Sequence, residues 1–598
     1  MKAKRLIPVL LSAAVFLPLI FSPSCANTTQ SPTGGPKDSI PPYITNIVPL
    51  PGTLNVPTSK TKIVFTFNEY VVIKDLKCIY LSPPLTKPAK ARISGKNLVV
   101  SFEEDLRPNT TYTLDLTGAL ADNNEGNMYP GYTYVFSTGD RIDSLYITGI
   151  VQESTTLKPV KGATVMLYKN HADSAVFLER PVAAVKTDDW GYFSLSYLQD
   201  TLYRLYAIRD DASDNLYDPQ ADLIAFYDSL VRPVLKVNDT IPELMKYEMK
   251  DTAACLARKT RYTLNLFREK PTKQYIVNKV RVSDRSSYIT FMAPGAWIDS
   301  LWIKGYPDKR LITQFNIEQD SLEIWVNDAK PVPDTLHLFV NYRKTDTTGK
   351  LKPSLEHVKL YREGVKKKAV GYNARKELKH EDTICVYKLD VKPETVEQKG
   401  FDLEFKDPIV NEKFDSLQLI MVNPKQKISY GKFDVEKDSL NLRHFIIRPR
   451  EKLLSGWEYR LKLPYRAFRD INGFYSDSTE VKVMLPANDD ASSLELILSD
   501  VPGRTLVDLL NESRKEVLRS YIIDAPATLL FPYLKKGKYC IRFTEDSNRN
   551  SIVDTGSLLE HRQPEKVRFL KINGDIFLEL PEKTELTQKA SVKEILND

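Results

Sequence analysis

The chain has 598 residues, a formal net charge of +7 at neutral pH, 42% hydrophobic residues and 27% charged residues. This length predicts several domains with buried cores. Lys and Arg are scattered among acidic residues without a basic stripe, which excludes a nucleic-acid-binding surface. The five cysteines are widely separated, which excludes a zinc cluster and a dense disulfide framework, so free buried thiols are expected.

The first 24 residues have the pattern of a secretory signal peptide. Three basic residues precede an apolar run over 6–21, which is shorter than the roughly 20 residues that span a bilayer. Two serines then lie close to Cys25, as in bacterial lipoproteins. We therefore expect acylation of Cys25 and attachment to a membrane through this lipid. The alternative is an ordinary signal peptide that is cleaved nearby, with Cys25 as an incidental thiol.

Residues 25–42 are rich in Thr, Ser, Gly and Pro, and this composition predicts a flexible tether. From residue 43 onward, short alternating apolar runs such as 62–67 and 111–116 predict β-strands. Turn residues separate these runs at roughly ten-residue spacing, which is typical of β-sandwiches. Helical spacing predicts a helix over 504–517 and a short one over 586–596.

The sequence also repeats itself. The segment 106–114 returns as 453–461, and the segment 197–203 aligns with 533–539 without a gap. Such repeats predict that one domain type is followed by a second, then by a middle insert, and then by both types again.

Two families share motifs with these repeats. Phe67-Asn-Glu-Tyr-Val71 and the closing segment 134–139 make residues 41–139 similar to the SbsA-type bacterial Ig-like domain. Pro159-Val-Lys-Gly-Ala163 and Gly191-Tyr-Phe193 make residues 143–235 resemble carboxypeptidase regulatory-like, or transthyretin-like, sandwiches. The leader Gly34-Gly-Pro-Lys-Asp38 resembles that of Ig-like lipoproteins of Bacteroidetes. The regulatory-like resemblance implies a fold and no catalytic activity.

Together these patterns predict an all-β, elongated, multidomain protein of tandem Ig-like and transthyretin-like sandwiches. The expected divisions are a signal peptide (1–24), a tether (25–42), an Ig-like domain (43–140), a regulatory-like sandwich (143–240), an unnamed sandwich (245–365), a diverged Ig-like domain (388–486), a diverged regulatory-like sandwich (492–570) and a C-terminal tail (571–598).

Two aligned acidic loops carry the sharpest chemical motif. Their oxygen-bearing residues are Asp210, Asp214 and Asp218 in the first loop, and Asp546, Asn548, Asn550 and Asp554 in the second. Calcium takes six to eight such oxygen ligands, so we expect calcium here, more at the second loop because Ala212 removes a ligand from the first. The alternative is a pair of Asx turns, in which these side chains bind their own backbone.

A further recurring signature is Asp, then Ser or Thr, then an apolar residue. It resembles the O-glycosylation sequon of Bacteroidetes envelope proteins, with Ser174, Ser300 and Ser416 as candidate attachment sites. Turns that lead into strands use the same residues, which is the structural alternative.

No catalytic motif was found, so the expected function is a non-enzymatic envelope scaffold or adhesion protein. The alternative is an accessory lipoprotein that binds a glycan or a protein through exposed aromatic residues such as Trp297 or Trp302, although both are expected in the core. Residues 26–30, immediately after Cys25, lack acidic side chains, which favours the periplasmic face of the outer membrane over the cell surface.

Overall fold

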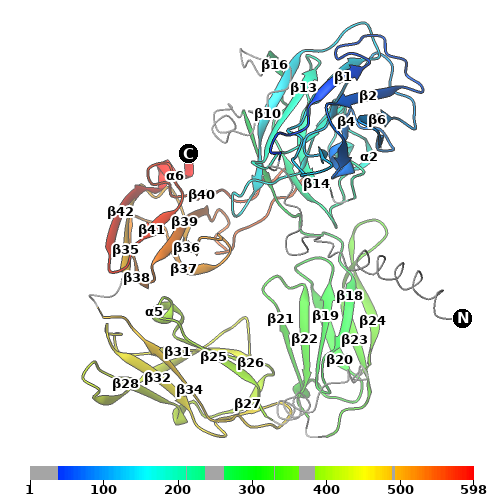
Figure 1. Cartoon of the computed structure of the whole chain (residues 1–598). Helices are drawn as coiled ribbons and strands as arrows, with labels where there is room; N and C mark the ends of the chain where they lie inside the picture. The colour runs from blue at the N-terminus through cyan, green and yellow to red at the C-terminus, as the bar shows by residue number, and fades with distance from the viewer. Residues whose placement is uncertain are drawn as a thin grey trace, which may run out of the picture.

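The computed structural model describes residues 38–210, 212–235, 261–328, 330–361, 384–487 and 492–597. They form successive β-sandwiches, whose strands pair mostly antiparallel, in an elongated, multidomain chain, which confirms the all-β prediction (Figure 1). Within these ranges, no helix has the length and apolar character needed to cross a membrane.

Domain 1 (residues 38–140) is a sandwich whose strands alternate as the sequence predicts. In β2, Ile63, Phe65 and Phe67 are buried and the residues between them are not, because successive side chains of a strand point to opposite faces. One sheet has the order β1 (Ile44–Val48), β2 (Lys62–Phe67), β6 (Asn97–Ser101), β5 (Lys90–Ser94); the other has β4 (Tyr80–Ser82), β7 (Thr111–Asp115), β9 (Thr133–Ser137); β3 (Val71–Ile73) pairs with β8 (Leu120–Asp122), and η1 (Leu76–Cys78) precedes β4.

Domain 2 (residues 143–235 and 261–268) ends later than expected. The strand Tyr262–Leu266 pairs in parallel with Leu145–Glu153, so the predicted boundary between 240 and 245 is wrong. The first sheet contains β13 (Tyr192–Leu198), β10 (Leu145–Glu153), β16 (Val234–Leu235) and β17 (Tyr262–Leu266); the second has the order β12 (Ala183–Lys186), β11 (Thr164–Tyr168), β14 (Arg204–Arg209), β15 (Leu223–Phe226), with α2 at Ala175–Leu178.

Domain 3 (residues 273–361) is a separate sandwich. Its longest hairpin joins two strands of eleven residues each, paired along their full length. One sheet has the order β18 (Ile276–Arg281), β19 (Ser286–Phe291), β22 (Ser321–Val326), β21 (Leu311–Phe315); the other has β20 (Ile298–Ile303), β23 (Thr335–Thr345), β24 (Leu351–Tyr361), and η3 spans Asp308–Arg310.

Domain 4 (residues 384–487) repeats the plan of domain 1. The hydroxyl of Tyr112 accepts a hydrogen bond from the Arg107 backbone amide, and that of Tyr459 accepts one from Leu454, each five residues upstream. The sheets are β25 (Tyr387–Asp390), β26 (Phe401–Phe405), β31 (His444–Pro449), β30 (Phe433–Lys437); β29 (Ile428–Gly431), β28 (Gln418–Val422), β32 (Glu458–Leu463), β34 (Thr479–Met484); and β27 (Ile409–Glu412) with β33 (Phe468–Asp470), with α5 at Val396–Lys399 and η4 at Phe414–Ser416.

Domain 5 (residues 492–597) repeats the plan of domain 2. The hydroxyls of Tyr203 and Tyr539 each donate to a backbone carbonyl four residues upstream. The sheets are β38 (Ala527–Leu534), β35 (Ser492–Ser499), β42 (Glu585–Ser591); and β37 (Val517–Ile523), β36 (Thr505–Asn511), β39 (Gly537–Glu545), β40 (Val567–Phe569), with β41 (Leu578–Leu580) also on β39 and α6 at Val592–Asn597.

Domain 5 also corrects three expectations. The helix over 504–517 is wrong, because this segment forms β36 and a turn. Leu509 faces the core while Leu510 packs on the outer face, and a strand covered on both faces loses the alternation that marks it. The tail at 571–598 is part of the domain, since β42 pairs in parallel with β35. The last predicted helix begins only at Val592.

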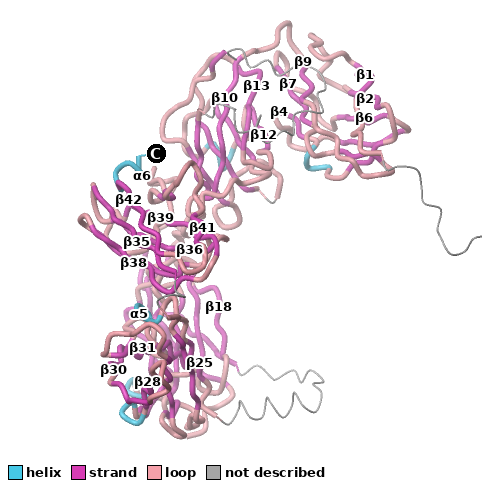
Figure 2. The backbone as a smooth tube through the Cα atoms, turned by 60° about the vertical axis from the view of Figure 1, so that its left-hand side comes forward, coloured by secondary structure: helices cyan, strands magenta, loops and turns pink. Residues whose placement is uncertain are grey.

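The domains form a closed circuit of contacts. Domains 2 to 5 follow one another, and the loop between β39 and β40 returns to domain 2 (Figure 1). Domain 1 extends away from this circuit (Figure 2). Hydrogen bonds join it to domain 2, for example from the Ala184 backbone amide to Ser82 Oγ at 2.9 Å.

Candidate functional site

The structure brings the two predicted acidic loops together at one junction. The first acidic loop (210–222) connects β14 to β15, and the second (546–566) connects β39 to β40. Tyr217 of the first loop and Leu558 of the second lie in one buried cluster. Glu269 joins them, since it accepts hydrogen bonds from the Tyr217 hydroxyl at 2.8 Å and from the Leu558 amide at 2.5 Å. The first loop also reaches domain 1 through a hydrogen bond between Tyr80 and Asn215.

In the first acidic loop, the aspartates accept hydrogen bonds from the loop backbone. Asp210 accepts from the amides of Ser213 and Asn215, Asp214 from Leu216, and Asp218 from Gln220. This is Asx-turn geometry, and it stabilises the positive φ angles of Ser213 and Asn215.

In the second acidic loop, Asp546 is buried and pairs with Arg504 Nε at 2.8 Å. It also accepts from the Asn550 and Ser551 amides. The side-chain amides of Asn548 and Asn550 both donate to Asp554 Oδ2. The second loop thus forms the same kind of turn as the first, with the Arg504 guanidinium as an additional partner of its first aspartate.

Burial raises the pKa of one carboxyl in each loop. In the first, burial raises the pKa of Asp222, and neighbouring Asp210 adds repulsion. In the second, burial raises the pKa of Glu565; Asp554 and Asp546 raise it further, although backbone hydrogen bonds oppose them. Within the described ranges, no three His, Cys, Asp or Glu side chains are grouped so as to hold a metal ion. Calcium at these loops stays a prediction.

An aromatic face lies on the β20–β23–β24 sheet of domain 3. Trp302, Phe339 and His357 stack across the three strands, with ring centroids 5.2 Å and 4.5 Å apart and nearly parallel planes. His337 continues the stack, and its Nδ1 lies 2.9 Å from His357 Nε2. Trp297, just before β20, is 68% exposed and Trp302 is 36% exposed.

The expectation that Trp297 and Trp302 lie in the core is therefore wrong. Ile298, Leu301 and Ile303 face the core of domain 3, and a β-bulge shifts the register between Ile298 and Ser300. The alternation of the strand consequently directs Trp302 outward. Two adjacent apolar residues, Leu301 and Trp302, carry no local signal of which one faces solvent.

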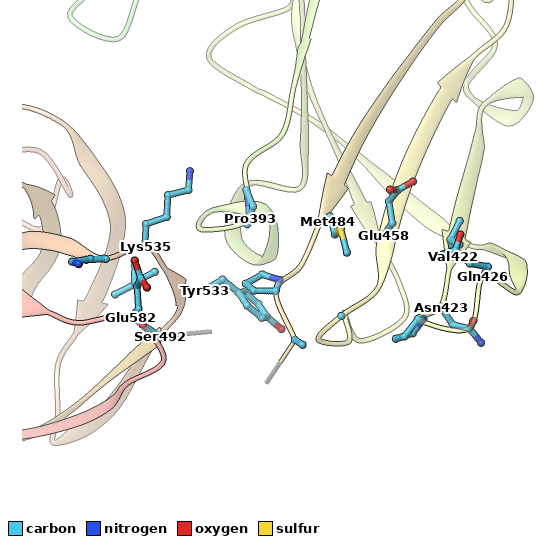
Figure 3. A pocket seen from close by; sticks show the side chains of 16 residues that line it. Pro393, Val422, Asn423, Gln426, Glu458, Met484, Ser492, Tyr533, Lys535 and Glu582 are labelled. Carbon is cyan, nitrogen blue, oxygen red and sulfur yellow. The ribbon is translucent and has the colours of Figure 1, made fainter. Parts of the chain in front are cut away.

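A cleft of about 1020 Å³ lies between domains 4 and 5. Figure 3 shows Tyr533, Ser492, Lys535 and Glu582 from domain 5 on one side, and Met484 with its neighbours from domain 4 on the other. Lys535 already pairs with Glu394 at 2.7 Å. The cleft is therefore part of the interface between the two domains, which this ion pair bridges. Sequence reasoning missed it because its walls come from segments that only folding brings together.

The remaining predicted sites are scattered. Ser174 and Ser300 are exposed, in domains 2 and 3, whereas Ser416 in domain 4 is half-buried and donates its hydroxyl to the Lys413 carbonyl at 2.6 Å. Cys25 and Cys255 lie outside the described residues. Free cysteines within those residues are Cys78, Cys385 and Cys540, of which the last two are buried.

Several solved structures resemble the chain at low similarity. The major pilin subunit BcpA of Bacillus cereus has 11% identity and a TM-score of 0.15, and the match covers 75% of this chain and 99% of that one. Domains 1–6 of the surface layer protein SbsC have 10% identity and a TM-score of 0.13, with 87% and 67% covered. A tetra-tandem repeat from the extending region of a large adhesion protein has 10% identity and a TM-score of 0.12, with 67% and 95% covered.

No curated protein matches the chain significantly. One family profile does match, and its span coincides with domain 1. Residues 38–138 match the bacterial Ig-like domain, in agreement with the sandwich that the structure shows there.

Proposed function

We propose that the protein is a non-enzymatic lipoprotein of the cell envelope that acts as a structural or adhesion scaffold. Its lipid would be carried by Cys25, in the outer membrane, at the periplasmic face. We further propose that domains 1 and 4 are SbsA-type Ig-like domains of the kind found in Bacteroidetes lipoproteins, and that domains 2 and 5 are regulatory-like, transthyretin-like sandwiches. The repeated strand orders support this assignment.

The observation that carries the scaffold proposal is the construction of the domain junctions. Arg519 of domain 5 is 2% exposed and donates to the Glu394 carbonyl of domain 4 at 2.6 Å. Between domains 3 and 4, Arg443 pairs with Glu323 at 2.9 Å. Polar contacts across the domain borders, one buried and one half-buried, hold neighbouring domains at defined angles, which suits a protein that positions a partner or a surface.

Lipid attachment is tested by labelling cells with a fatty acid. The wild-type protein and a Cys78→Ser control should incorporate the label and stay with the membrane, whereas Cys25→Ser should do neither. Protease added to intact cells should leave the protein uncut if it faces the periplasm. Label on the Cys25→Ser variant would refute the anchor.

The scaffold role is tested in cells that lack the protein. Adhesion to surfaces or resistance of the envelope to detergent should fall, and the wild-type chain should restore it while Cys25→Ser should not. Cells that are unchanged in both assays would contradict the proposal.

A second candidate function is glycan binding at the aromatic face. The exposure of Trp297 and Trp302 in domain 3 favours it, because aromatic rings offer apolar faces to sugars beside polar side chains. Calorimetry of the full chain with envelope polysaccharides should show binding that Trp297→Ala and Trp302→Ala abolish. Trp190→Ala is the matched control, since Trp190 is 48% exposed in domain 2. Equal binding by all variants would exclude the aromatic face of domain 3 as a glycan-binding site.

A further inference from the structure

The second acidic loop leaves its own domain and binds domain 2. We propose that it is a releasable latch, which closes the circuit of domains 2 to 5 and opens before any domain unfolds. This inference concerns conformation and does not depend on the proposed scaffold role.

The apolar part of the latch is one leucine in a prepared site. Leu558 is 1% exposed and lies in a cluster with Tyr206, Phe226 and Phe267 of domain 2. Nearby, a Cβ at Gly556 would come within 2.6 Å of the Phe267 ring and 2.8 Å of the Arg562 carbonyl. Only glycine allows the loop to approach domain 2 this closely.

The polar part surrounds this leucine. His561 Nε2 lies 2.9 Å from Asp173 Oδ2. The Gln563 side-chain amide donates to the Phe226 carbonyl at 3.0 Å and to Asp228 at 2.7 Å. These partners lie at the end of β15, just after it, or beside α2, more than 300 residues away in sequence. The contacts therefore connect the two ends of the circuit directly.

The latch is small compared with the domains that it joins. It buries one large apolar side chain, whereas the core of domain 2 contains Val165, Leu167, Phe193, Leu205 and many others. Its contact between His561 and Asp173 is partly exposed on both sides, where even a charged pair contributes little. Release therefore requires less free energy than unfolding of either domain.

Release would change the length of the molecule. With the latch closed, domain 5 is held against domain 2. Outside the latch, Arg514 of domain 5 donates to the Thr156 carbonyl of domain 2 at 2.9 Å, and Leu157 packs against the cluster that contains Leu510. Once the latch is released, these few contacts and the junctions between consecutive domains remain. Domain 1 extends on one side and residue 597 ends in domain 5 (Figures 1 and 2). A pull between the two ends of the chain would therefore load the latch directly.

Hydrogen exchange of the full chain provides the first test. Leu558→Asp should increase exchange at β15 and in the segment around Phe267 at least tenfold, while the cores of domains 2 and 5 stay protected. Leu559→Asp makes the same change one residue later, at a side chain that is 66% exposed, and should have no effect. Unchanged exchange in Leu558→Asp, or loss of protection throughout both cores, would overturn the proposal.

Force measurement provides the second test, with handles at the two chain ends. The wild-type chain should show an extension step at lower force than any domain unfolding. A chain carrying Asp173→Cys and His561→Cys, joined by a short bis-maleimide, should lose only this step, and the two single-cysteine variants should retain it. Absence of the step in the wild type, or its persistence in the joined chain, would refute the latch.

Discussion

Domains 2 and 5 share one fold, but the outer face of one sheet differs between them. This sheet contains β11 and β14 in domain 2, and β36 and β39 in domain 5. Strand register places Met166 and Tyr206 of domain 2 where domain 5 has Asp508 and Arg542. In domain 2 these residues belong to an apolar layer. In domain 5 they form a buried ion pair at 2.7 Å.

The difference explains why other segments gather on domain 2. An apolar outer face must be covered to be stable, and domain 1 and the second acidic loop provide this cover. In domain 5 the polar part of the face satisfies its own groups, since Ser520 also donates to Asp508 at 2.6 Å. The apolar part of that face is the cluster around Leu510, against which Leu157 of domain 2 packs. A repeated fold thus acquires different neighbours through a few outward positions.

The ion pair of domain 5 should give the largest effect when broken. Asp508→Ala leaves Arg542 buried without its partner, and we expect a loss of about 3–5 kcal/mol in the free energy of unfolding. Urea unfolding followed by hydrogen exchange at β36 measures this loss.

The control for that variant transplants the residues of domain 2. Asp508→Met combined with Arg542→Tyr removes both charges, so the double variant should be close to the wild type or more stable. If the single variant lost less than about 1 kcal/mol, the pair would contribute nothing to domain 5.

Calcium would sharpen the comparison between the two acidic loops. After chelation, added calcium at a hundredfold excess over its dissociation constant should stabilise domain 5 by about 2.7 kcal/mol. Asp546→Ala and Asp554→Ala should abolish this shift in thermal unfolding, and Asp210→Ala should leave it intact. Without a shift in the wild type, both loops are turns only.

The tyrosine hydrogen bonds should respond alike in both domains. Tyr203→Phe and Tyr539→Phe each remove one hydroxyl that donates to a backbone carbonyl, at 3.1 Å and 2.7 Å. Each should lower the free energy of unfolding of its domain by about 0.5–1.5 kcal/mol. A much larger loss in one domain would show that the same hydrogen bond stabilises the two domains to different extents.

The smallest effect concerns pH. The raised pKa values of Asp222 and Glu565 mean that the folded state favours the protonated carboxyls. Their stabilising contribution is complete below the unfolded pKa of about 4 and is lost as pH rises through the higher folded values. The free energy of unfolding of the wild type should therefore fall as pH rises from 4 to 7. Asp222→Asn and Glu565→Gln should make this fall smaller. A larger fall in the variants would contradict the raised pKa values.

Much of the fold was accessible from the sequence because strands and turns leave local signals. Alternation located β2 and β7, and the repeat of 197–203 at 533–539 predicted two copies of one domain type, which the matching strand orders bear out. The predictions that failed concern segments whose structure depends on contacts with residues far away in the sequence. Leu509 and Leu510 face opposite covered sides of β36, so their spacing looked helical, and β17 and β42 join their sheets by parallel pairing from far along the chain.

For the candidate sites, too, some features follow from local sequence and others from the folded chain. The amino-acid sequence by itself determined the two acidic loops, since Asp and Asn direct turns through contacts with their own backbone. Only the tertiary structure decided that the second loop lies on domain 2 and that Trp302 faces solvent. Those outcomes depend on which residues from distant segments cover a given face, and burial of that kind is a property of the assembled chain.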